Sequence, residues 1–313
     1  MDDVLRFVSP YSATICASFK TVTIMPEFTS PFDIHLTVEN TDSSAVDLLA
    51  EATGLSKQQI KQVMQKGAVW LEEKKTGKPR RLRRASKTPA VGDELHLYYD
   101  SRVLESIPAS PQLIADQGEY SIWYKPYGLL SQGSKWGDHC TIQRWVEQNL
   151  TPQRPAFVVH RLDRAATGLI IIAHQKRMAS KLAKLFAQRE MEKRYQVIVH
   201  GRFPESTWPK KIDTDIDDRS ARSYASLLEY NEEKDRSLLD VRIDTGRKHQ
   251  IRKHLLGIGF PVVGDRLYAG EGQQEEGEEN LQLTASSLTF VCPITQQEKH
   301  FKLPEVLALK LCL

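Results

Sequence analysis

One short loop carries the strongest indication of chemistry in this chain. Residues 160–164 read His-Arg-Leu-Asp-Arg, and Asp163 is the one carboxylate among them. Apolar runs at 156–159 and 169–173 flank the loop and predict two buried strands. The neighbouring arginines favour an ionised carboxylate, which suits a nucleophile or an electrostatic stabiliser better than a general acid. Taken alone, Asp163 is better explained by a salt bridge that pins the loop.

Two more clusters lie further along the chain. Tyr195 starts a predicted strand directly after a lysine and an arginine, and segment 246–254 is rich in basic and amide side chains. His249 and His254 lack the spacing of a zinc-binding HExxH helix, so we expect no metal site. The glycines near them form neither a GxGxxG motif nor a phosphate-binding P-loop, so we expect no nucleotide cofactor.

Composition places the chain among ordinary globular proteins. It has 313 residues, 40% of them hydrophobic and 27% charged, which predicts about two domains. The four cysteines form no CxxC pair, the start of the chain is acidic, and no apolar run reaches the length of a membrane span. We therefore expect a cytoplasmic protein without membrane segments.

The distribution of charge is more informative than the net charge of +3. Eight basic residues and no acidic residue fall within 74–87, and five glutamates with no basic residue fall within 271–279. The basic run is a candidate phosphate-binding patch, and a solvated loop is an equally good explanation. The acidic run is best explained as a solvated insertion.

The elements that must position these residues fall into four parts. We expect an N-terminal arm over 1–38, a compact domain over 39–100, a linker over 101–117 and a larger domain over 118–313. In the compact domain, Ser56 is a good N-cap for a helix that Gly67 ends. In the larger domain, strands joined by short turns mix with helices. The pattern predicts an α+β fold, a mixed, mostly antiparallel sheet with flanking helices.

The ordered clusters resemble the RluA-type RNA pseudouridine synthases over about 118–313. The resemblance rests on residues 160–163, Tyr195 after Lys193-Arg194, residues 249–252, and the turn Lys125-Pro126-Tyr127-Gly128. Residues 45–100 resemble a second family, the S-four-like (alpha-L) RNA-binding motif, a small α/β module. That resemblance departs from its family between Leu71 and Val91, where the basic run stands.

The first resemblance implies an isomerase that converts uridine in rRNA or tRNA to pseudouridine without a cofactor. Its target base must be flipped into a pocket. By resemblance Asp163 is the catalytic aspartate, Tyr195 stacks on the uracil, Arg252 pairs with the aspartate and Arg161 helps to hold the flipped nucleotide. The other side chains expected to bind substrate are His160, Arg247, His249, Gln250 and Lys125, with Arg80, Arg81, Arg83 and Arg84 contacting phosphates.

The sequence also departs from the family beside Asp163. Ala166-Thr167-Gly168 stands where the family has Thr-Ser-Gly, which removes a hydroxyl that could orient Asp163. Together with the S-four-like module and the basic run, this departure leaves an alternative function, an RNA-binding or ribosome-assembly factor whose catalysis is secondary or lost. A carboxylate-dependent glycosidase would need a second acidic group beside the bond. We expect a monomer whose partner is RNA.

Overall fold

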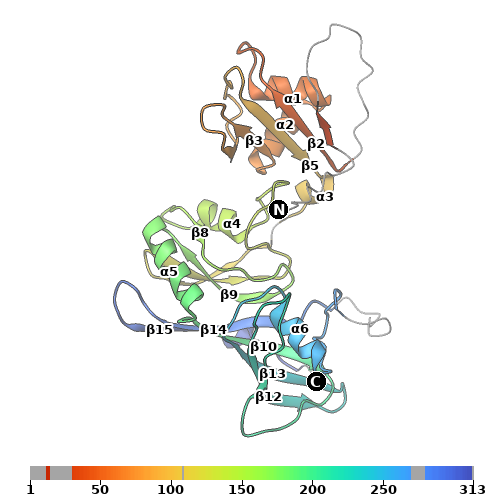
Figure 1. Cartoon of the computed structure of the whole chain (residues 1–313), viewed down its shortest axis with the longest axis vertical. Helices are drawn as coiled ribbons and strands as arrows, with labels where there is room; N and C mark the ends of the chain where they lie inside the picture. The colour runs from red at the N-terminus through yellow and green to blue at the C-terminus, as the bar shows by residue number, and fades with distance from the viewer. Residues whose placement is uncertain (1–11, 15–29, 108, 269–278, 312–313) are drawn as a thin grey trace. The chain divides into compact units, whose positions relative to one another are not determined.

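The computed structural model describes residues 12–14, 30–107, 109–268 and 279–311 (Figure 1). These residues form two compact units. The first combines the described residues up to 107 with Gly133–Thr141, and the second contains the rest. Most of the predicted N-terminal arm and nearly all of the acidic run lie outside the described residues.

The first unit is a five-stranded sheet with two helices on one face. Its strand order is β1-β2-β5-β3-β4, and β1 is parallel to β2 whereas the other pairs are antiparallel. The elements are β1 (Ser12–Thr14), β2 (Phe32–Thr37), α1 (Ala45–Thr53), α2 (Lys57–Gln65), β3 (Val69–Glu72), β4 (Pro79–Arg81), β5 (Glu94–Tyr99) and the short α3 (Ser101–Leu104).

Local sequence explains both long helices of this unit. Ser44 and Ser56 begin α1 and α2 with capping boxes, in which each serine accepts from the third helical amide. Alternate residues of β2 and β5, such as Ile34 and Leu97, are fully buried with Ile60 of α2. The helices thus cover one face of the sheet, and the other residues of these strands face away from them.

The second unit is built on a ten-stranded sheet. The main strand order is β11-β12-β13-β10-β14-β9-β7-β6, while β15 pairs with β14 and β8 pairs with β9. The strands are β6 (Gln112–Asp116), β7 (Tyr120–Lys125), β8 (Phe157–Val158), β9 (Thr167–Ala173), β10 (Glu192–His200), β11 (Lys210–Ile212), β12 (Ser223–Asn231), β13 (Arg236–Ile243), β14 (Leu283–Val291) and β15 (Glu298–Lys302). The β9 and β14 pair is parallel, and the other strand pairs of this sheet are antiparallel.

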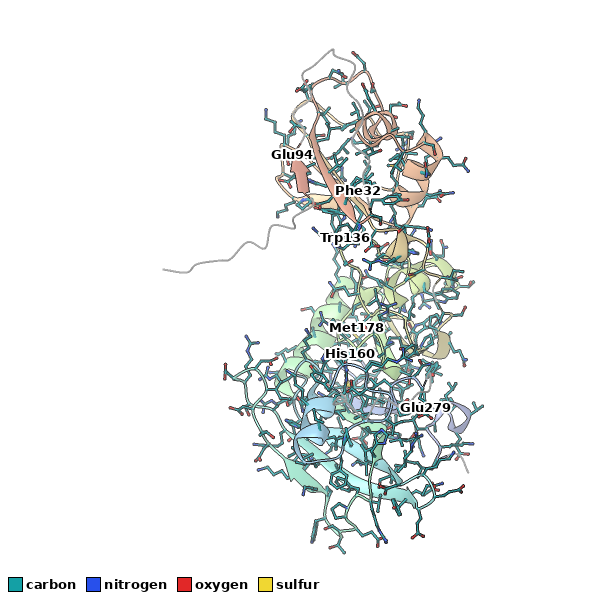
Figure 2. The ribbon with its side chains drawn as sticks, turned by 90° about the vertical axis from the view of Figure 1, so that its right-hand side faces the viewer. Phe32, Glu94, Trp136, His160, Met178 and Glu279 are labelled. Carbon is teal, nitrogen blue, oxygen red and sulfur yellow. The ribbon has the colours of Figure 1, made fainter. Side chains whose placement is uncertain are left out.

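Helices cover both faces of this sheet. They are α4 (Ile142–Asn149), α5 (Lys176–Gln188) and α6 (Gln250–Gly257), with a short 3-10 helix at Glu305–Leu307. Met178 of α5 is fully buried against one face (Figure 2), and Val146 of α4 and Leu255 of α6 are buried in the core of the other. None of the described helices is long and apolar enough to cross a bilayer.

The central strand β9 shows why its sequence is apolar throughout. Ile170 and Ile172 join the core that includes α4 and α6, whereas Leu169 and Ile171 join the core beneath α5. A strand covered on both faces loses the alternation of polar and apolar residues. The predicted α+β fold with a mixed, mostly antiparallel sheet is confirmed.

The segment predicted as a linker carries secondary structure in its described residues. Residues 101–117 contain α3 and the edge strand β6, which pairs with β7 through a register shift between Leu113 and Ala115. A short, mostly exposed edge strand has too few buried residues to leave an alternating pattern.

The segment Gly133–Thr141 belongs to the first unit, although its neighbours in sequence belong to the second.

Candidate active site

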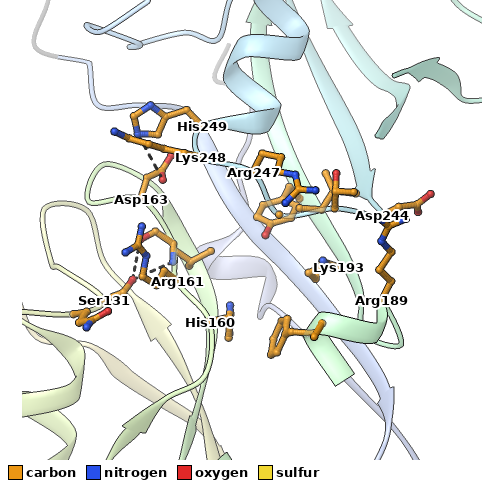
Figure 3. Close-up of a pocket in the computed structure, with 18 of the residues that line it drawn as sticks. Ser131, His160, Arg161, Asp163, Arg189, Lys193, Asp244, Arg247, Lys248 and His249 are labelled. Atoms are coloured by element: carbon orange, nitrogen blue, oxygen red, sulfur yellow. Dashed lines mark hydrogen bonds and ion pairs between the residues drawn. The ribbon is translucent and has the colours of Figure 1, made fainter. Parts of the chain in front are cut away.

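A pocket of about 740 Å³ in the second unit brings the three sequence clusters together (Figure 3). Its walls are the loop 160–164, the start of β10 and the loop that follows β13. Lining side chains that were predicted to bind substrate or to act in catalysis are His160, Arg161, Asp163, Tyr195, Arg247 and His249. Residues that are far apart in the chain thus face one cavity.

A buried serine holds the loop that carries Asp163. The Ser131 hydroxyl donates to the Leu162 carbonyl oxygen at 2.8 Å and accepts from the Leu162 amide at 3.0 Å. The Ala166 amide then donates to the Asp163 carbonyl oxygen at 3.2 Å, which closes a tight turn. Ser131 lies 31 residues before Leu162, and sequence reasoning missed it because no local pattern links the two.

The Ala166-Thr167-Gly168 segment anchors this turn to the sheet. Gly168 has a φ of +106°, and a Cβ there would lie 2.3 Å from the Ala285 carbonyl oxygen of β14. The Thr167 hydroxyl lies 2.5 Å from the Thr284 hydroxyl, also on β14. Ala166 is buried in the apolar core. The two residues that depart from the family motif therefore face away from the pocket: Ala166 faces the core and Thr167 faces β14. Gly168, which the motif keeps, is required because the backbone of β14 approaches it closely.

Asp163 faces a buried arginine across a short gap. The Arg252 Nη1 atom lies 3.6 Å from Asp163 Oδ2, and His249 Nε2 lies 3.8 Å from Asp163 Oδ1. The Asp163 side chain is 28% exposed and the Arg252 side chain 6%. A partly open carboxylate with a fixed cation behind it can meet a substrate that approaches from the pocket.

A second carboxylate fixes that arginine. Asp265 accepts from Arg252 Nε at 2.7 Å and from Nη2 at 2.5 Å, and it also accepts from the backbone amides of Leu267 and Tyr268. Burial disfavours the charge on Arg252, but its hydrogen bonds to Asp265 and the charges of Asp265 and Asp163 outweigh burial and raise its pKa. Asp265 is thus the partner that orients Arg252.

Tyr268 ties this network to His249. The Tyr268 ring lies beneath the Arg252 guanidinium, with 4.9 Å from the ring centroid to Cζ, and its hydroxyl is 2.8 Å from His249 Nδ1. His249 itself has a left-handed backbone, with φ of 55°, at the N-cap of α6. Burial lowers the pKa of His249, while the charge of Asp163 opposes this shift. A neutral imidazole therefore sits beside the carboxylate.

Tyr195 reaches the pocket from β10. Its register against β14 shifts between Arg194 and Tyr195, an irregularity that can re-aim a side chain. Burial, together with the charge of Asp163, raises the pKa of Tyr195. The phenol consequently keeps its proton at neutral pH and offers an aromatic face and a hydroxyl group to the cavity.

His160 lines the end of the pocket that is away from Asp163 and His249 (Figure 3). Its Nε2 atom accepts from the Ile171 amide at 3.0 Å, so a neutral ring carries its hydrogen on Nδ1. The ring stacks on Phe186 with 4.5 Å between centroids. Burial lowers the pKa of His160 to about 3, which keeps it uncharged. Lys193, also buried and in the pocket wall, has its pKa lowered by burial.

Two predicted substrate ligands of the second unit, Lys125 and Gln250, lie outside the pocket lining. Lys125 is fully buried, and its ammonium donates to three backbone carbonyls at 2.9 to 3.4 Å, including that of Arg164. Gln250 is buried as well; its side chain accepts from the Thr245 hydroxyl and the Arg247 amide. Both residues brace the loops that line the pocket. Burial lowers the pKa of Lys125 to about 7, with the charge of Asp163 opposing this shift.

The four arginines of the basic run lie in the first unit and differ in their surroundings. Arg81 and Arg83 pair with Asp138, at 3.1 and 2.5 Å, within the segment Gly133–Thr141. Arg80 pairs with Glu73 and is 63% exposed. Arg84, also exposed, donates to the Ser86 hydroxyl. A phosphate would therefore compete with Asp138 for Arg81 and Arg83 and meet Arg80 and Arg84 at the surface.

Comparison with known proteins adds an independent line of evidence. A family model described as RNA pseudouridylate synthase matches residues 119–256. The chain is 32% identical to tRNA pseudouridine synthase C of Vibrio cholerae, over 59% of this chain and 87% of that protein. It is 29% identical to ribosomal large subunit pseudouridine synthase D of Buchnera aphidicola, over 57% and 62%. Human RNA pseudouridylate synthase domain containing 1 has a similar fold, with a TM-score of 0.54, 20% identity and coverage of 64% and 86%.

Proposed function

The chain belongs to the RluA-type RNA pseudouridine synthases, and we propose that Asp163 is the catalytic aspartate, acting on a uridine flipped into the pocket. The family makes the chain an isomerase of uridine in RNA. The observation that supports the proposal best is the partly exposed Asp163 carboxylate, held 3.6 Å from the buried Arg252 in a pocket that Tyr195 also lines.

The reaction defines what the pocket must do. The bond between uracil N1 and ribose C1′ breaks, the ring turns, and C5 bonds to C1′; C5 then loses its proton and N1 gains one, so the composition is unchanged. An ionised carboxylate beside the nucleotide serves either attack at the ribose or addition to the uracil ring. Arg252 supports that role because it holds a positive charge 3.6 Å from the carboxylate. His249 is placed beside the same carboxylate.

Tyr195 supplies a surface for the uracil. A base removed from its stack loses favourable contacts, and an aromatic side chain replaces them. Since burial raises the pKa of Tyr195, a phenolate base is disfavoured and a stacking face with a hydroxyl donor is favoured. Arg161 and Arg247, both in the lining, are placed to hold the flipped nucleotide and its phosphates.

Release of tritium from RNA labelled at uridine C5 tests the assignment of Asp163. We expect Asp163→Asn to bind the same RNA with unchanged affinity and to release no tritium above background. Asp217→Asn is a matched control because Asp217 is an exposed aspartate outside the pocket lining. Normal release by Asp163→Asn would overturn the assignment, and loss of release by the control would show that the assay reports general damage.

The RNA substrate is proposed as rRNA or tRNA, because relatives are named for each. We propose that the first unit is an S-four-like RNA-binding domain and that its exposed arginines contact phosphates, which position RNA without reading its sequence. Pseudouridine mapping in total RNA from a strain that lacks the protein would identify the site. A strain with every pseudouridine intact would contradict the proposal.

The two kinds of arginine in the basic run permit a sharper test. We expect Arg80→Gln with Arg84→Gln to weaken RNA binding and to flatten its dependence on salt by about one unit of slope for each phosphate that is no longer neutralised. We expect Arg81→Gln to lower thermal stability as well, since it breaks the pair with Asp138. An unchanged salt slope in the double variant would refute a phosphate-binding role.

A further inference from the structure

The small sheet of the first unit has a polar cluster on the face turned away from its helices. Asp33 and His35 lie on β2, Glu94 and His96 on β5, and Glu72 on β3. The strand register places His35 opposite His96 and Glu94 opposite Glu72. Five ionisable side chains from three neighbouring strands therefore share one patch. None of them belongs to the pocket described above.

A relay of hydrogen bonds sets the tautomer of His96. Asp33 Oδ2 lies 3.0 Å from His35 Nε2, and His35 Nδ1 lies 2.6 Å from His96 Nδ1. A carboxylate accepts, so His35 donates from Nε2 and its Nδ1 becomes an acceptor. His96 must then donate from Nδ1, which leaves the Nε2 atom of a neutral His96 with a free lone pair.

That lone pair faces two carboxylates. His96 Nε2 lies 3.7 Å from Glu72 Oε2 and 4.0 Å from Glu94 Oε2, and one ligand atom from each of the three residues lies within 4.8 Å of the other two. All three atoms are acceptors. Within the part of the chain that the structure describes, neither glutamate carboxylate forms an ion pair with a lysine or an arginine.

Two carboxylates of the patch also lie close to each other. Glu72 and Glu94 are directly opposite each other on paired strands, where like charges repel. Asp33 is 4% exposed, and its Oδ1 atom has no hydrogen-bond partner among the described residues. A cation between the glutamates would relieve this repulsion. It would also bind His96 Nε2, the atom that the hydrogen bonds from Asp33 through His35 leave with a free lone pair.

We propose that Glu72, Glu94 and His96 bind one divalent transition-metal ion of the Zn²⁺ class, with Asp33 and His35 orienting the histidine. Zn²⁺ takes imidazole nitrogen and carboxylate oxygen at about 2.0–2.2 Å. A histidine that binds metal almost always donates its other ring N–H to a carboxylate, a backbone carbonyl or a water, and here His35, itself bonded to Asp33, takes that place. The glutamate side chains, 34% and 52% exposed, are free to close on the ion, which would tie β3 to β5.

Metal titration of the full chain, first stripped with a chelator, tests the proposal. We expect calorimetry to count one more Zn²⁺ in the wild type than in Glu94→Gln, and Zn²⁺ to raise Tm more in the wild type. Co²⁺ should give visible absorption bands in the wild type without a thiolate charge-transfer band, which excludes cysteine as the ligand. Glu39→Gln is the control, since Glu39 is an exposed glutamate outside the cluster.

The metal-free proteins separate this proposal from its main competitor, a proton on His96 that bridges both glutamates. If the space is built for a metal, removing one carboxylate relieves repulsion, and metal-free Glu94→Gln melts no lower than the metal-free wild type. If a proton bridges the glutamates, the variant melts lower and Zn²⁺ binding is equal in the two proteins. Either of these last two results would overturn the metal site.

Discussion

The buried Lys125 makes the stability of the fold depend on pH in a direction that can be worked out. Burial lowers the pKa of Lys125 from its ordinary 10.5 to about 7 in the folded chain. Between these values the unfolded chain holds a proton that the folded chain has lost. Stability rises with pH wherever the unfolded state binds more protons. The Lys125 contribution is therefore lowest below a pH of about 7 and grows toward a pH of about 10.5.

The size of the effect follows from linkage. One proton changes the free energy of unfolding by at most about 1.4 kcal/mol per pH unit. Integrated from a pH of about 7 to about 9 with the two pKa values above, the gain is about 2 kcal/mol. Lys125→Met removes this titration. It also removes donors to the carbonyls of Pro126 and Leu129, so its absolute stability is expected to differ at every pH.

The informative quantity is consequently how the free energy of unfolding changes with pH in each protein, and not its absolute value at one pH. Urea unfolding of wild type and Lys125→Met at several pH values gives their difference in free energy of unfolding. That difference should shift by about 2 kcal/mol in favour of the wild type between pH values of about 7 and 9. Lys61→Met, at an exposed lysine of α2, should show no such shift. A constant difference for Lys125→Met would refute the reasoning that burial has displaced its titration.

Three other substitutions test the packing around Asp163. Arg252→Lys cannot keep both bonds to Asp265 while reaching toward Asp163, so we expect tritium release to fall about 100-fold, equivalent to about 3 kcal/mol; wild-type rates would contradict this. Ala166→Thr should lower the free energy of unfolding in urea by about 1–3 kcal/mol through overpacking without raising activity, and a more active variant would contradict it. Gly168→Ala should yield little folded protein, as judged by circular dichroism and gel filtration, because its Cβ would collide with β14.

Much of the fold could be predicted because its signals are local. Ser56 predicts the start of a helix since its hydroxyl caps an amide three residues away. The apolar run that forms β9 predicts a buried strand whatever its neighbours are. The edge strand β6 was missed because its few half-buried residues leave no pattern. The segment 133–141 was assigned with its sequence neighbours, and its packing on the first unit depends on contacts such as that of Arg83 with Asp138.

The candidate site likewise has one part that the sequence predicts and another part that depends on tertiary contacts. The sequence by itself predicted, through its resemblance to the family, that Asp163, Tyr195 and Arg252 act together, because the motif residues keep their order and chemical type along the chain. Tertiary structure alone decided how they are held. It brought Asp265 to Arg252, aimed Tyr195 into the pocket and buried Lys125 among backbone carbonyls. These contacts join separate elements, and periodicity within one element does not encode its partner in another.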